Sequence, residues 1–354
     1  MKINRKQFVE ALEKVSPALG INILVPEFQY FQIEGNHIQA FDGVLLADLT
    51  LPIDTGLICA IPKEVLSLLS SLNVEEIDLV IKNDELQVRT TKLEGKFSVL
   101  IPPKFQPLSQ IDADADVKLI DSNLIDDIVE GLNFCKFGVS RDMTAGPICG
   151  VQINGDTLFS TDRYRVVKWV LNKDSGVICS VPLKFIDLLK RNRDKISELG
   201  CIGDKIFVAV LKDKTYISTC LLQGEYRELR GYFPDKLTDC KQVEFEEDLA
   251  LAIDRHLALL KDVNSVDRET TIEAKEGICT LTSKVPERSN LVEHIDVKME
   301  KGSEISFSVN PTFLKEISSR CSSFKYFDNG LILFETEKLQ YLMRAAVSSS
   351  KKEE

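Results

Sequence analysis

The sequence predicts an α+β protein made of three tandem domains, each with two helices packed on antiparallel sheets. Its 354 residues exceed the roughly 100 to 200 residues of a single domain. One stretch of the chain repeats another at a fixed spacing of 120 residues. In each third, a helical spacing of apolar residues is followed by short alternating runs that are typical of strands. Together these three observations predict one module used three times.

The repeat is clearest between residues 51–70 and residues 171–190. Eight of the twenty aligned positions are identical, where ordinary residue usage predicts about one or two. The same spacing aligns residues 31–42 with residues 151–162. A more diverged copy at residues 305–318 keeps the order of a strand that runs through a proline into a helix. A module of about 115 to 125 residues therefore fits three times into the chain.

Each third is expected to contain the same elements in the same order. A helix opens it, strands follow that meet at turns (residues 34–36, 154–156 and 328–330), and a second helix has a proline near its start, where a missing N–H is tolerated. Further strands close the module, such as residues 77–81 and 86–89. The apolar positions of the opening helices are Phe8, Val9, Leu12 and Val15, then Leu124, Ile125, Ile128 and Leu132, then Leu249, Ile253, Leu257 and Leu260. The prolines of the second helices are Pro62, Pro182 and Pro311.

Two polar segments that contain prolines, residues 102–116 and 232–241, predict the boundaries between modules. The expected domains are residues 1–115, 116–241 and 242–354, the last with a short polar tail.

Composition limits the classes of function. With 44% hydrophobic and 28% charged residues, the chain is an ordinary globular protein rather than a collagen-like, disordered or disulfide-scaffold protein. Subtracting 55 acidic from 44 basic residues gives a net charge of -11, which excludes non-specific attraction to nucleic acid over the whole surface. Any contact with DNA must therefore be local.

The expected compartment is the cytoplasm. The charged N-terminal residues lack the apolar centre of a signal peptide, and no apolar stretch approaches the length of a transmembrane helix. The nine cysteines are unclustered, which indicates reduced thiols.

The motifs of the middle third identify a family. Gly150-Val151 opens one expected strand, Thr161-Asp162-Arg163-Tyr164-Arg165 follows the next, and residues 223–234 lead out of the module. In these motifs, and in the three-module layout of the whole chain, the sequence resembles the bacterial DNA polymerase III beta subunit, the sliding clamp, or a phage-encoded relative of it.

The resemblance implies a ring of six similar domains around duplex DNA, formed by two copies joined head to tail. Head-to-tail interfaces close into rings when the rotations complete a turn, and open strand edges on the terminal domains would supply the pairing surface. Because the duplex is trapped in such a ring, weak contacts with phosphates suffice and permit sliding. The implied partners are double-stranded DNA, bound without sequence preference, and DNA polymerase and clamp loader, bound through short peptides. The implied role is a processivity factor without an active site or cofactor.

Positive charge is expected on the helices that face the DNA. The strongest basic stripe is the predicted helix at residues 182–196, whose five cations against two carboxylates give +3. The alternative for each basic residue is a solvated surface charge. Two features weaken direct contact: the loop at residues 20–22 has no Arg where bacterial relatives carry one that touches DNA, and the helix at residues 121–130 is acidic. The candidates are Arg5, Lys6, Lys14, Lys63, Lys136, Arg141, Lys184, Lys190, Arg191, Arg193, Lys195, Lys315 and Arg320.

The resemblance also implies an apolar pocket for partner peptides. At the spacing of the repeat, Tyr164 and Arg165 replace the apolar Val44 and Leu45 of the first third, and Tyr and Arg are typical anchors of peptide sites. The alternative is an exposed strand end. Arg163 and Tyr164 stand where the family has Gly and His, and residues 341–346 replace its usual ending, so the peptide preference is expected to differ. The candidates are Thr161, Arg163, Tyr164, Arg165, Val166, Arg230, Tyr232, Phe233, Met343 and Arg344.

Rival functions find less support. The three histidines are not at ligand spacing, and no nucleophile, phosphate-loop or zinc motif occurs, so no metal or cofactor is expected. Asp112, Asp114 and Asp116 begin like a calcium loop, but Val117 and Asn123 occupy the positions of its Gly and Glu, which favours a solvated linker. The stronger rival is a scaffold of the same fold that binds proteins without encircling DNA.

Overall fold

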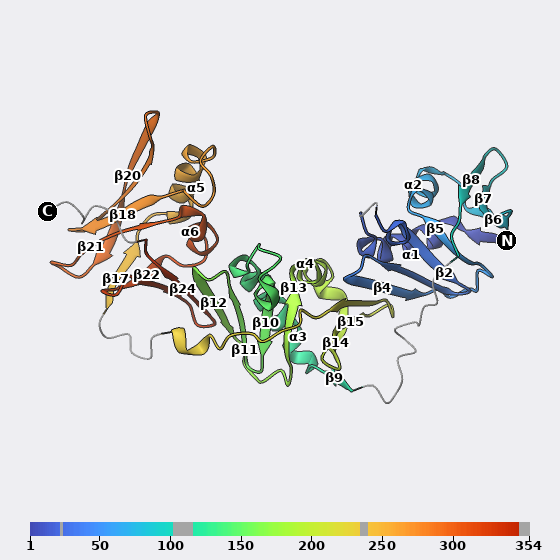
Figure 1. Ribbon diagram of the computed structural model, residues 1–354, viewed down its shortest axis with the longest axis horizontal. Helices are drawn as coiled ribbons and strands as arrows, with labels where there is room; N and C mark the ends of the chain where they lie inside the picture. Colours follow the sequence, from blue (N-terminus) through green and yellow to red (C-terminus); the bar gives the residue numbers. More distant parts are fainter. Residues whose placement is uncertain (22–23, 102–115, 234–239, 347–354) are drawn as a thin grey trace. The chain divides into compact units, whose positions relative to one another are not determined.

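The computed structural model describes residues 1–21, 24–101, 116–233 and 240–346. Within them one order of elements occurs three times: a strand, a helix, four strands, a helix and three strands (Figure 1). The first series is β1 (Lys2–Asn4), α1 (Arg5–Val15), β2 (Tyr30–Glu34), β3 (His37–Phe41), β4 (Leu45–Thr50), β5 (Ile58–Pro62), α2 (Glu64–Ser71), β6 (Glu76–Lys82), β7 (Glu85–Arg89) and β8 (Glu94–Ser98).

The second and third series contain the same elements. The second is β9 (Val117–Leu119), α3 (Ile125–Cys135), β10 (Gly150–Asn154), β11 (Thr157–Thr161), β12 (Arg165–Val170), β13 (Ile178–Pro182), α4 (Leu183–Arg191), β14 (Ile196–Ile202), β15 (Ile206–Leu211) and β16 (Tyr216–Cys220). The third is β17 (Cys240–Phe245), α5 (Leu249–Leu259), β18 (Thr270–Lys275), β19 (Ile278–Val285), β20 (Ser289–Met299), β21 (Glu304–Val309), α6 (Pro311–Ser318), β22 (Ser323–Phe327), β23 (Leu331–Glu335) and β24 (Leu339–Arg344).

The predicted α+β class and the threefold order of elements are confirmed. Two helix bounds were wrong. The helix predicted at residues 182–196 ends at Arg191, because residues 193–195 form a 3-10 turn that leads into β14. The helix predicted at residues 121–130 begins at Ile125 and runs to Cys135, since Asp121 caps the preceding 3-10 turn by accepting from Asn123 N. The predicted domain boundaries fall in or beside undescribed segments and stay a prediction, although β17 already begins at Cys240.

Capping side chains fix where several helices begin. Asn4 Oδ1 accepts from Gln7 N at 3.0 Å before α1, and Asn310 Oδ1 accepts from Thr312 N at 3.0 Å before α6. Such caps satisfy N–H groups that have no helical partner. Pro311 is the first residue of α6, whereas Pro62 and Pro182 end the strands β5 and β13 just before a helix.

The chain divides into two compact units, which are described separately. The first contains residues 1–133, 153–155 and 173–224. It has a four-stranded sheet in the order β1-β6-β7-β8 and an eight-stranded sheet in the order β5-β2-β3-β4-β16-β15-β14-β9. The helix α1 buries Phe8, Leu12 and Val15 completely, and it packs against α2 (Figure 1). The apolar spacing of α1 therefore marks its core face, as predicted.

The second unit contains residues 134–152, 156–172 and 225–354. Its strands follow the order β11-β12-β24-β23-β22-β17-β20-β19-β18-β21, and α5 packs against α6 (Figure 1). Phe307, Phe324 and Phe334 form part of its aromatic core, with ring centroids of neighbouring pairs 5.5 to 5.8 Å apart. Across the described parts of both units, no helix is long and apolar enough to cross a membrane.

One type of strand pairing recurs between successive series. In the first unit β4 pairs antiparallel with β16, the last strand of the second series. In the second unit β12 pairs antiparallel with β24, the last strand of the third series. Because β4 and β12 begin 120 residues apart, at Leu45 and Arg165, the repeat in the sequence is also a repeat of this joint.

Two strands at the corresponding positions have no such partner within the described residues. β8 is the last strand of its series and forms an edge of the four-stranded sheet. β20 is the counterpart of β4 and β12. On one side it pairs with β19 from Ser289 to Asp296, whereas on the other side β17 pairs only with Val297–Met299. Residues 289–295 of β20 therefore have one open side.

A buried histidine lies behind this open segment. The His256 side chain is fully buried on α5, and its Nδ1 is 2.8 Å from Ser283 Oγ. Its Nε2 has no hydrogen bond within the described structure and lies 3.7 Å from Glu293 Oε2, on β20. Glu293 in turn accepts from the Arg255 guanidinium. Burial lowers the pKa of His256; the Arg255 charge acts in the same direction, while Glu293 opposes it.

Stability is therefore expected to fall in mild acid through His256. Its folded pKa lies below the unfolded value of about 6.5, so its contribution is complete above that value and is lost as pH falls through the folded pKa. His256→Gln should flatten the decline of the urea midpoint between about pH 7 and about pH 5. The exposed His294, changed to Gln, serves as the matched control. Equal slopes in wild type and His256→Gln would contradict this role.

Candidate functional site

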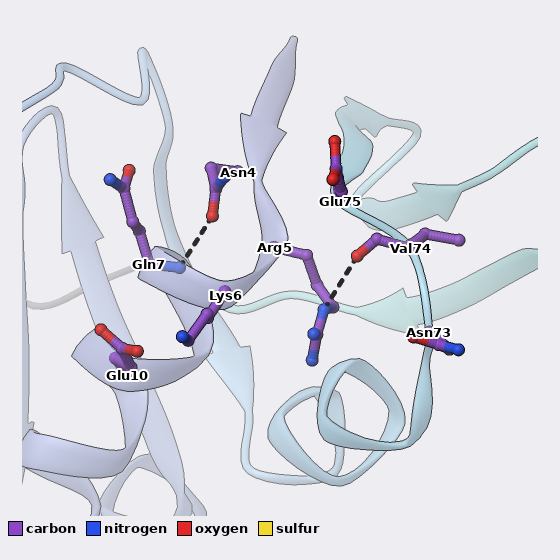
Figure 2. Close-up of a pocket in the computed structure, with 8 residues that line it drawn as sticks. All are labelled: Asn4, Arg5, Lys6, Gln7, Glu10, Asn73, Val74 and Glu75. Carbon is purple, nitrogen blue, oxygen red and sulfur yellow. Dashed lines mark hydrogen bonds between the residues drawn. The ribbon is translucent and has the colours of Figure 1, made fainter.

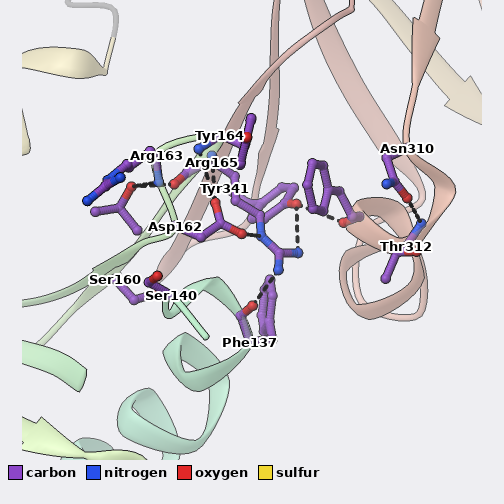
Figure 3. A network of polar contacts seen from close by, with 12 residues as sticks. Phe137, Ser140, Ser160, Asp162, Arg163, Tyr164, Arg165, Asn310, Thr312 and Tyr341 are labelled. Atoms are coloured by element: carbon purple, nitrogen blue, oxygen red, sulfur yellow. Dashed lines mark hydrogen bonds and ion pairs between the residues drawn. The ribbon is translucent and has the colours of Figure 1, made fainter. Parts of the chain in front are cut away.

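The turn between β11 and β12 is built by two side chains (Figure 3). Asp162 Oδ1 accepts from Tyr164 N at 3.1 Å and from Arg165 N at 3.2 Å. Thr161 Oγ1 accepts from Arg163 N at 3.1 Å and donates to Arg165 O at 2.7 Å. These bonds close the loop tightly and leave Arg163 and Tyr164 exposed, Tyr164 to 70%. The predicted Thr-Asp-x-x-Arg motif is thus a strand-to-strand turn.

Arg163 adopts a backbone conformation that usually belongs to glycine. Its φ is 78°, and at the matching place in the first series Gly43 has a φ of 95°. There Asp42 Oδ1 accepts from Val44 N and Leu45 N, so the two turns share one design. A left-handed conformation costs a residue with a side chain roughly 1 to 2 kcal/mol. The second series therefore has an arginine at a position whose backbone conformation favours glycine.

Arg165 is an internal connector rather than an exposed anchor, which changes the role expected from the sequence (Figure 3). Its side chain is only 10% exposed, and its Nε donates to Asp162 Oδ2 at 2.9 Å. Its Nη2 donates to Phe137 O at 2.6 Å, and its guanidinium carbon lies 4.5 Å from the centre of the Phe313 ring. One side chain thus ties β12 to the 3-10 turn at residues 136–138 and to α6.

Tyr341 of β24 completes this connection. Its hydroxyl donates to Phe313 O at 2.7 Å and lies 3.5 Å from Arg165 Nη1. Burial raises the pKa of Tyr341 to about 12, so the hydroxyl keeps its proton as a donor. Phe137, Phe313 and Tyr341 were not among the predicted site residues. Only the position of Tyr341, two residues before the predicted Met343, gave a signal for one of them.

An apolar cluster lies next to the turn. Val166 and Phe233, both predicted, belong to it, together with Leu342, which pairs with Val166 across the β12–β24 joint. The predicted Met343 is buried as the pairing partner of Arg165, on the opposite side of β24 from Leu342. The remaining members are Phe159, Leu229, Phe327 and Leu333, with Tyr226, Cys240 and Leu331 packed against them. The structure therefore brings the predicted pocket residues together in one unit.

Polar and aromatic side chains lie next to this cluster or to the adjoining turn. Arg230 Nη2 donates to Asp156 Oδ1 at 2.8 Å, and Lys168 Nζ lies 5.3 Å from the centre of the Phe233 ring. Tyr232 is 48% exposed, and Arg344 is exposed at the end of β24. The Tyr164 ring stacks on Phe313 with centroids 6.0 Å apart.

Among the predicted DNA-facing residues, Arg5 has a structural role. Its Nε donates to Val74 O at 3.1 Å, and its Nη1 to Leu69 O at 3.4 Å, in the last turn of α2. Carbonyls at a helix end lack helical partners, so Arg5 joins the start of α1 to the end of α2. Arg5 and Lys6 line a polar cavity of about 620 Å³ there. Figure 2 shows the side chains that line it. Lys6 is the exposed cation of this region.

Several other predicted cations are paired inside the protein. Each of these contacts neutralises or engages a charge that was assigned to DNA from the sequence. They are Lys14 with Asp213 at 2.7 Å, Lys184 with Asp42 at 3.0 Å, Arg193 with Asp126 at 3.0 Å, Lys315 with Asp254 at 2.9 Å and Lys63 with Gln29 at 2.9 Å. Arg320, which lies beyond the end of α6, stacks over Phe134 at 4.3 Å, and Lys136 is half-buried after α3.

A smaller set of predicted cations remains exposed. Lys190 and Arg191 end α4, and Lys195 lies in the following turn. Their ammonium and guanidinium groups have no hydrogen bond or ion pair with the described residues, which is also true of Lys6 and Arg141. Asn22 of the 20–22 loop and Asp112 and Asp114 of the rejected calcium loop lie outside the described residues. Within the described residues, the unpaired cations of the basic stripe are thus Lys190, Arg191 and Lys195.

Comparison with known proteins identifies the fold. No family model matches the sequence, and no curated protein matches it. Solved structures do match over the whole chain. A DNA polymerase sliding clamp from Pseudomonas aeruginosa is 17% identical, with a TM-score of 0.80 over 98% of this chain and 99% of the other. A sliding clamp from Bacillus subtilis is also 17% identical, with a TM-score of 0.81 over 98% of each chain.

A third match carries a ligand. It is a sliding clamp, DNA polymerase III subunit beta, from Bartonella birtlesii bound to griselimycin, 15% identical with a TM-score of 0.81 over 98% of this chain and 99% of the other. All three sources are bacteria, so a phage origin stays a prediction. The threefold order of elements, the recurrent strand joint and these matches agree: the chain has the fold of the bacterial sliding clamps, the DNA polymerase III beta subunits.

Proposed function

We propose that this protein is a DNA sliding clamp, a polymerase processivity factor that encircles duplex DNA as a homodimer. The observation that carries the proposal is the recurrent joint. The third of four central strands in one series pairs with the last strand of the next, as in β4–β16 and β12–β24. The two strands left over, β20 and β8, are the two that a third joint of this type would need.

A second copy can supply the missing partner on each side. β20 of one copy would pair with β8 of the other, and the reverse pairing would close the assembly. Such an interface is head to tail, and it closes into a ring when the rotations complete a turn. Closure also covers two strand edges that would otherwise be open to aggregation. Two copies of three modules give the six-domain ring that the sequence resemblance implies.

The second proposed surface is the apolar cluster around Val166, Phe233 and Leu342, with the exposed turn beside it. It would take short peptides of DNA polymerase and clamp loader. In this role the protein is an accessory subunit in the cytoplasm with no active site of its own. The three domains would be residues 1–115, 116–241 and 242–354, each one series of elements.

The test combines solution mass and topology. The protein should run at about twice its 39.8 kDa chain mass. After loading, it should remain on closed circular DNA and be lost when the circle is cut once, because only a linear duplex lets a ring slide off. The uncut circle is the matched control. Equal loss from both forms would refute encirclement.

A protein-binding scaffold of the same fold is the second candidate. It is favoured by the ion pairs that engage Lys14, Lys184, Arg193 and Lys315, and by the net charge of -11. A stable monomer that binds partner peptides but is not retained on circular DNA would establish it.

A further inference from the structure

Several side chains next to the apolar cluster are cationic, in a protein whose net charge is -11. Arg230 lies between Leu229 and Phe233, both members of the cluster, and Lys168 Nζ lies over the Phe233 ring. The strand pairing places Arg344 opposite Leu331, which packs against the same cluster. Three cations, Lys168, Arg230 and Arg344, therefore adjoin one apolar surface.

Acidic side chains also adjoin this surface: Glu225 and Glu228 are exposed beside Tyr226 and Leu229, with Glu228 Oε1 accepting from Arg230 N at 2.8 Å. Asp142 interacts electrostatically with Arg163. Asp162 is occupied by Arg165 and by two backbone N–H groups, so it does not face a ligand as a free carboxylate. Asp156 pairs with Arg230. The pKa of Lys168 is lowered, first by burial and then by the charge of Arg230, while Asp156 opposes the shift.

Arg163 adds a cation in a position that its backbone does not favour. The first series keeps Gly43 in the same left-handed turn, and that turn closes with the same Asp bonds. The second series has Arg163 there, exposed, and its guanidinium makes no hydrogen bond or ion pair with the described residues. Strained backbone held against local preference is characteristic of functional positions. Because the same turn forms with glycine in the first series, the second series gains only the Arg163 side chain.

The aromatic side chains determine which ligand suits these cations. Tyr164 is 70% exposed and stacks on Phe313, and Tyr232 is 48% exposed with its hydroxyl 3.4 Å from Arg227 Nη1. The apolar cluster itself contains aliphatic side chains such as Leu229 and Leu342. Aliphatic surface favours leucine-like and phenylalanine-like side chains, whereas single-stranded DNA is usually held on successive aromatic platforms.

We propose that this surface binds a short acidic peptide, in which carboxylates face Arg163, Arg230 and Arg344 while large apolar side chains contact the cluster around Val166 and Phe233. The inference rests on the proposed function, because it names the chemistry of the partner at the proposed peptide site. Charge-assisted pairing gives such a site its selectivity, and Arg presents a planar fork that matches a carboxylate.

Fluorescence anisotropy with the full-length protein tests this selectivity. The probes are three labelled peptides that end in two leucines and a phenylalanine, preceded by two glutamates, two glutamines or two lysines. The glutamate peptide should bind roughly tenfold more tightly than its glutamine isostere at about 50 mM NaCl. The difference should shrink at about 300 mM NaCl, where exposed charges are screened. Equal affinity of the glutamate and glutamine peptides would overturn the proposal.

The variant Arg163→Gly separates binding from folding. Glycine suits the φ of this turn, so the unfolding midpoint should not fall. Affinity for the glutamate peptide should drop several-fold, roughly the effect of one charged contact, with no change for the glutamine peptide. An unchanged affinity for the glutamate peptide would exclude Arg163 from the site. Preferential binding of a single-stranded thymidine oligonucleotide would instead assign the surface to nucleic acid and overturn the peptide proposal.

Retention on circular DNA distinguishes this inference from the proposed function. Once loaded, Arg163→Gly should leave circular DNA as slowly as the wild type, since the turn is assigned to partner peptides, including those of the loader, and not to DNA; only the dissociation rate, and not the amount loaded, is compared. Retention on circles without binding to any of the three peptides would support the clamp function and refute the acidic-peptide proposal. Preference for the glutamate peptide without retention on circles would support the acidic-peptide site and refute the clamp function.

Discussion

Replacing Arg165 with alanine is expected to lower the free energy of unfolding by roughly 3 to 5 kcal/mol, the usual effect of removing one partner of a buried ion pair. The change leaves Asp162, only 15% exposed, without its counter-charge. It also removes the donor at 2.6 Å from Phe137 O and the cation over the Phe313 ring. The contact between β12, α6 and the 136–138 turn should therefore loosen together.

Urea unfolding at neutral pH measures this effect. Arg165→Lys should recover only part of the loss, because an ammonium cannot reproduce the planar set of donors. Arg163→Ala, two residues away in the same turn, is the matched control, since its guanidinium has no such partners in the described structure. Similar destabilisation by Arg165→Ala and Arg163→Ala would contradict the assigned role of Arg165.

Reversing Lys190, Arg191 and Lys195 to glutamate is expected to shorten the lifetime on closed circular DNA by roughly tenfold or more. These three cations are exposed at the end of α4 and in the turn after it. In a dimeric ring six charges change sign, and each lost phosphate contact reduces both affinity and its salt dependence. Arg193 is left intact because it pairs with Asp126 and Glu130, so its reversal would place like charges together.

A control with the same charge shows whether position matters. Lys82, Lys92 and Lys205 are exposed at strand ends and turns of the same unit. Their reversal to glutamate changes the net charge by the same three times -2, from -11 to -17. Retention of this control with loss of the α4 variant would support a DNA-facing α4. Equal retention of the two variants would remove α4 from the DNA-facing surface.

Much of the fold could be predicted because the repeat and the apolar spacing reflect local geometry. The positions Phe8, Leu12 and Val15 fall on one helix face, and all three are buried. The helix end at Arg191 was missed because the sequence remains helix-compatible through residue 195. What stops the helix is β14, whose first residue, Ile196, pairs with Leu211.

The predicted pocket residues lie in one unit, but Phe137, Phe313 and Tyr341 were missed and the role of Arg165 could not be predicted. Arg165 was recognised by its motif, yet its partners Phe137 and Phe313 come from distant parts of the chain. The basic residues were counted correctly, but their counter-ions, such as Asp213 for Lys14, are not neighbours in sequence. Charge can be read from the chain, whereas the neutralisation of that charge depends on the tertiary fold. Arg163 shows the opposite case, since the repeat itself revealed Gly43 as its counterpart.

The recurrent joint also determines where a two-copy ring is weakest. The β4–β16 and β12–β24 joints each connect parts of one covalent chain, which gives them an effective concentration in about the millimolar range. A β20–β8 joint between copies has no tether, and its occupancy follows the amount of protein present. The ring is therefore expected to open first at the two β20–β8 junctions between copies. A head-to-tail fusion of two copies would leave only one junction that can open.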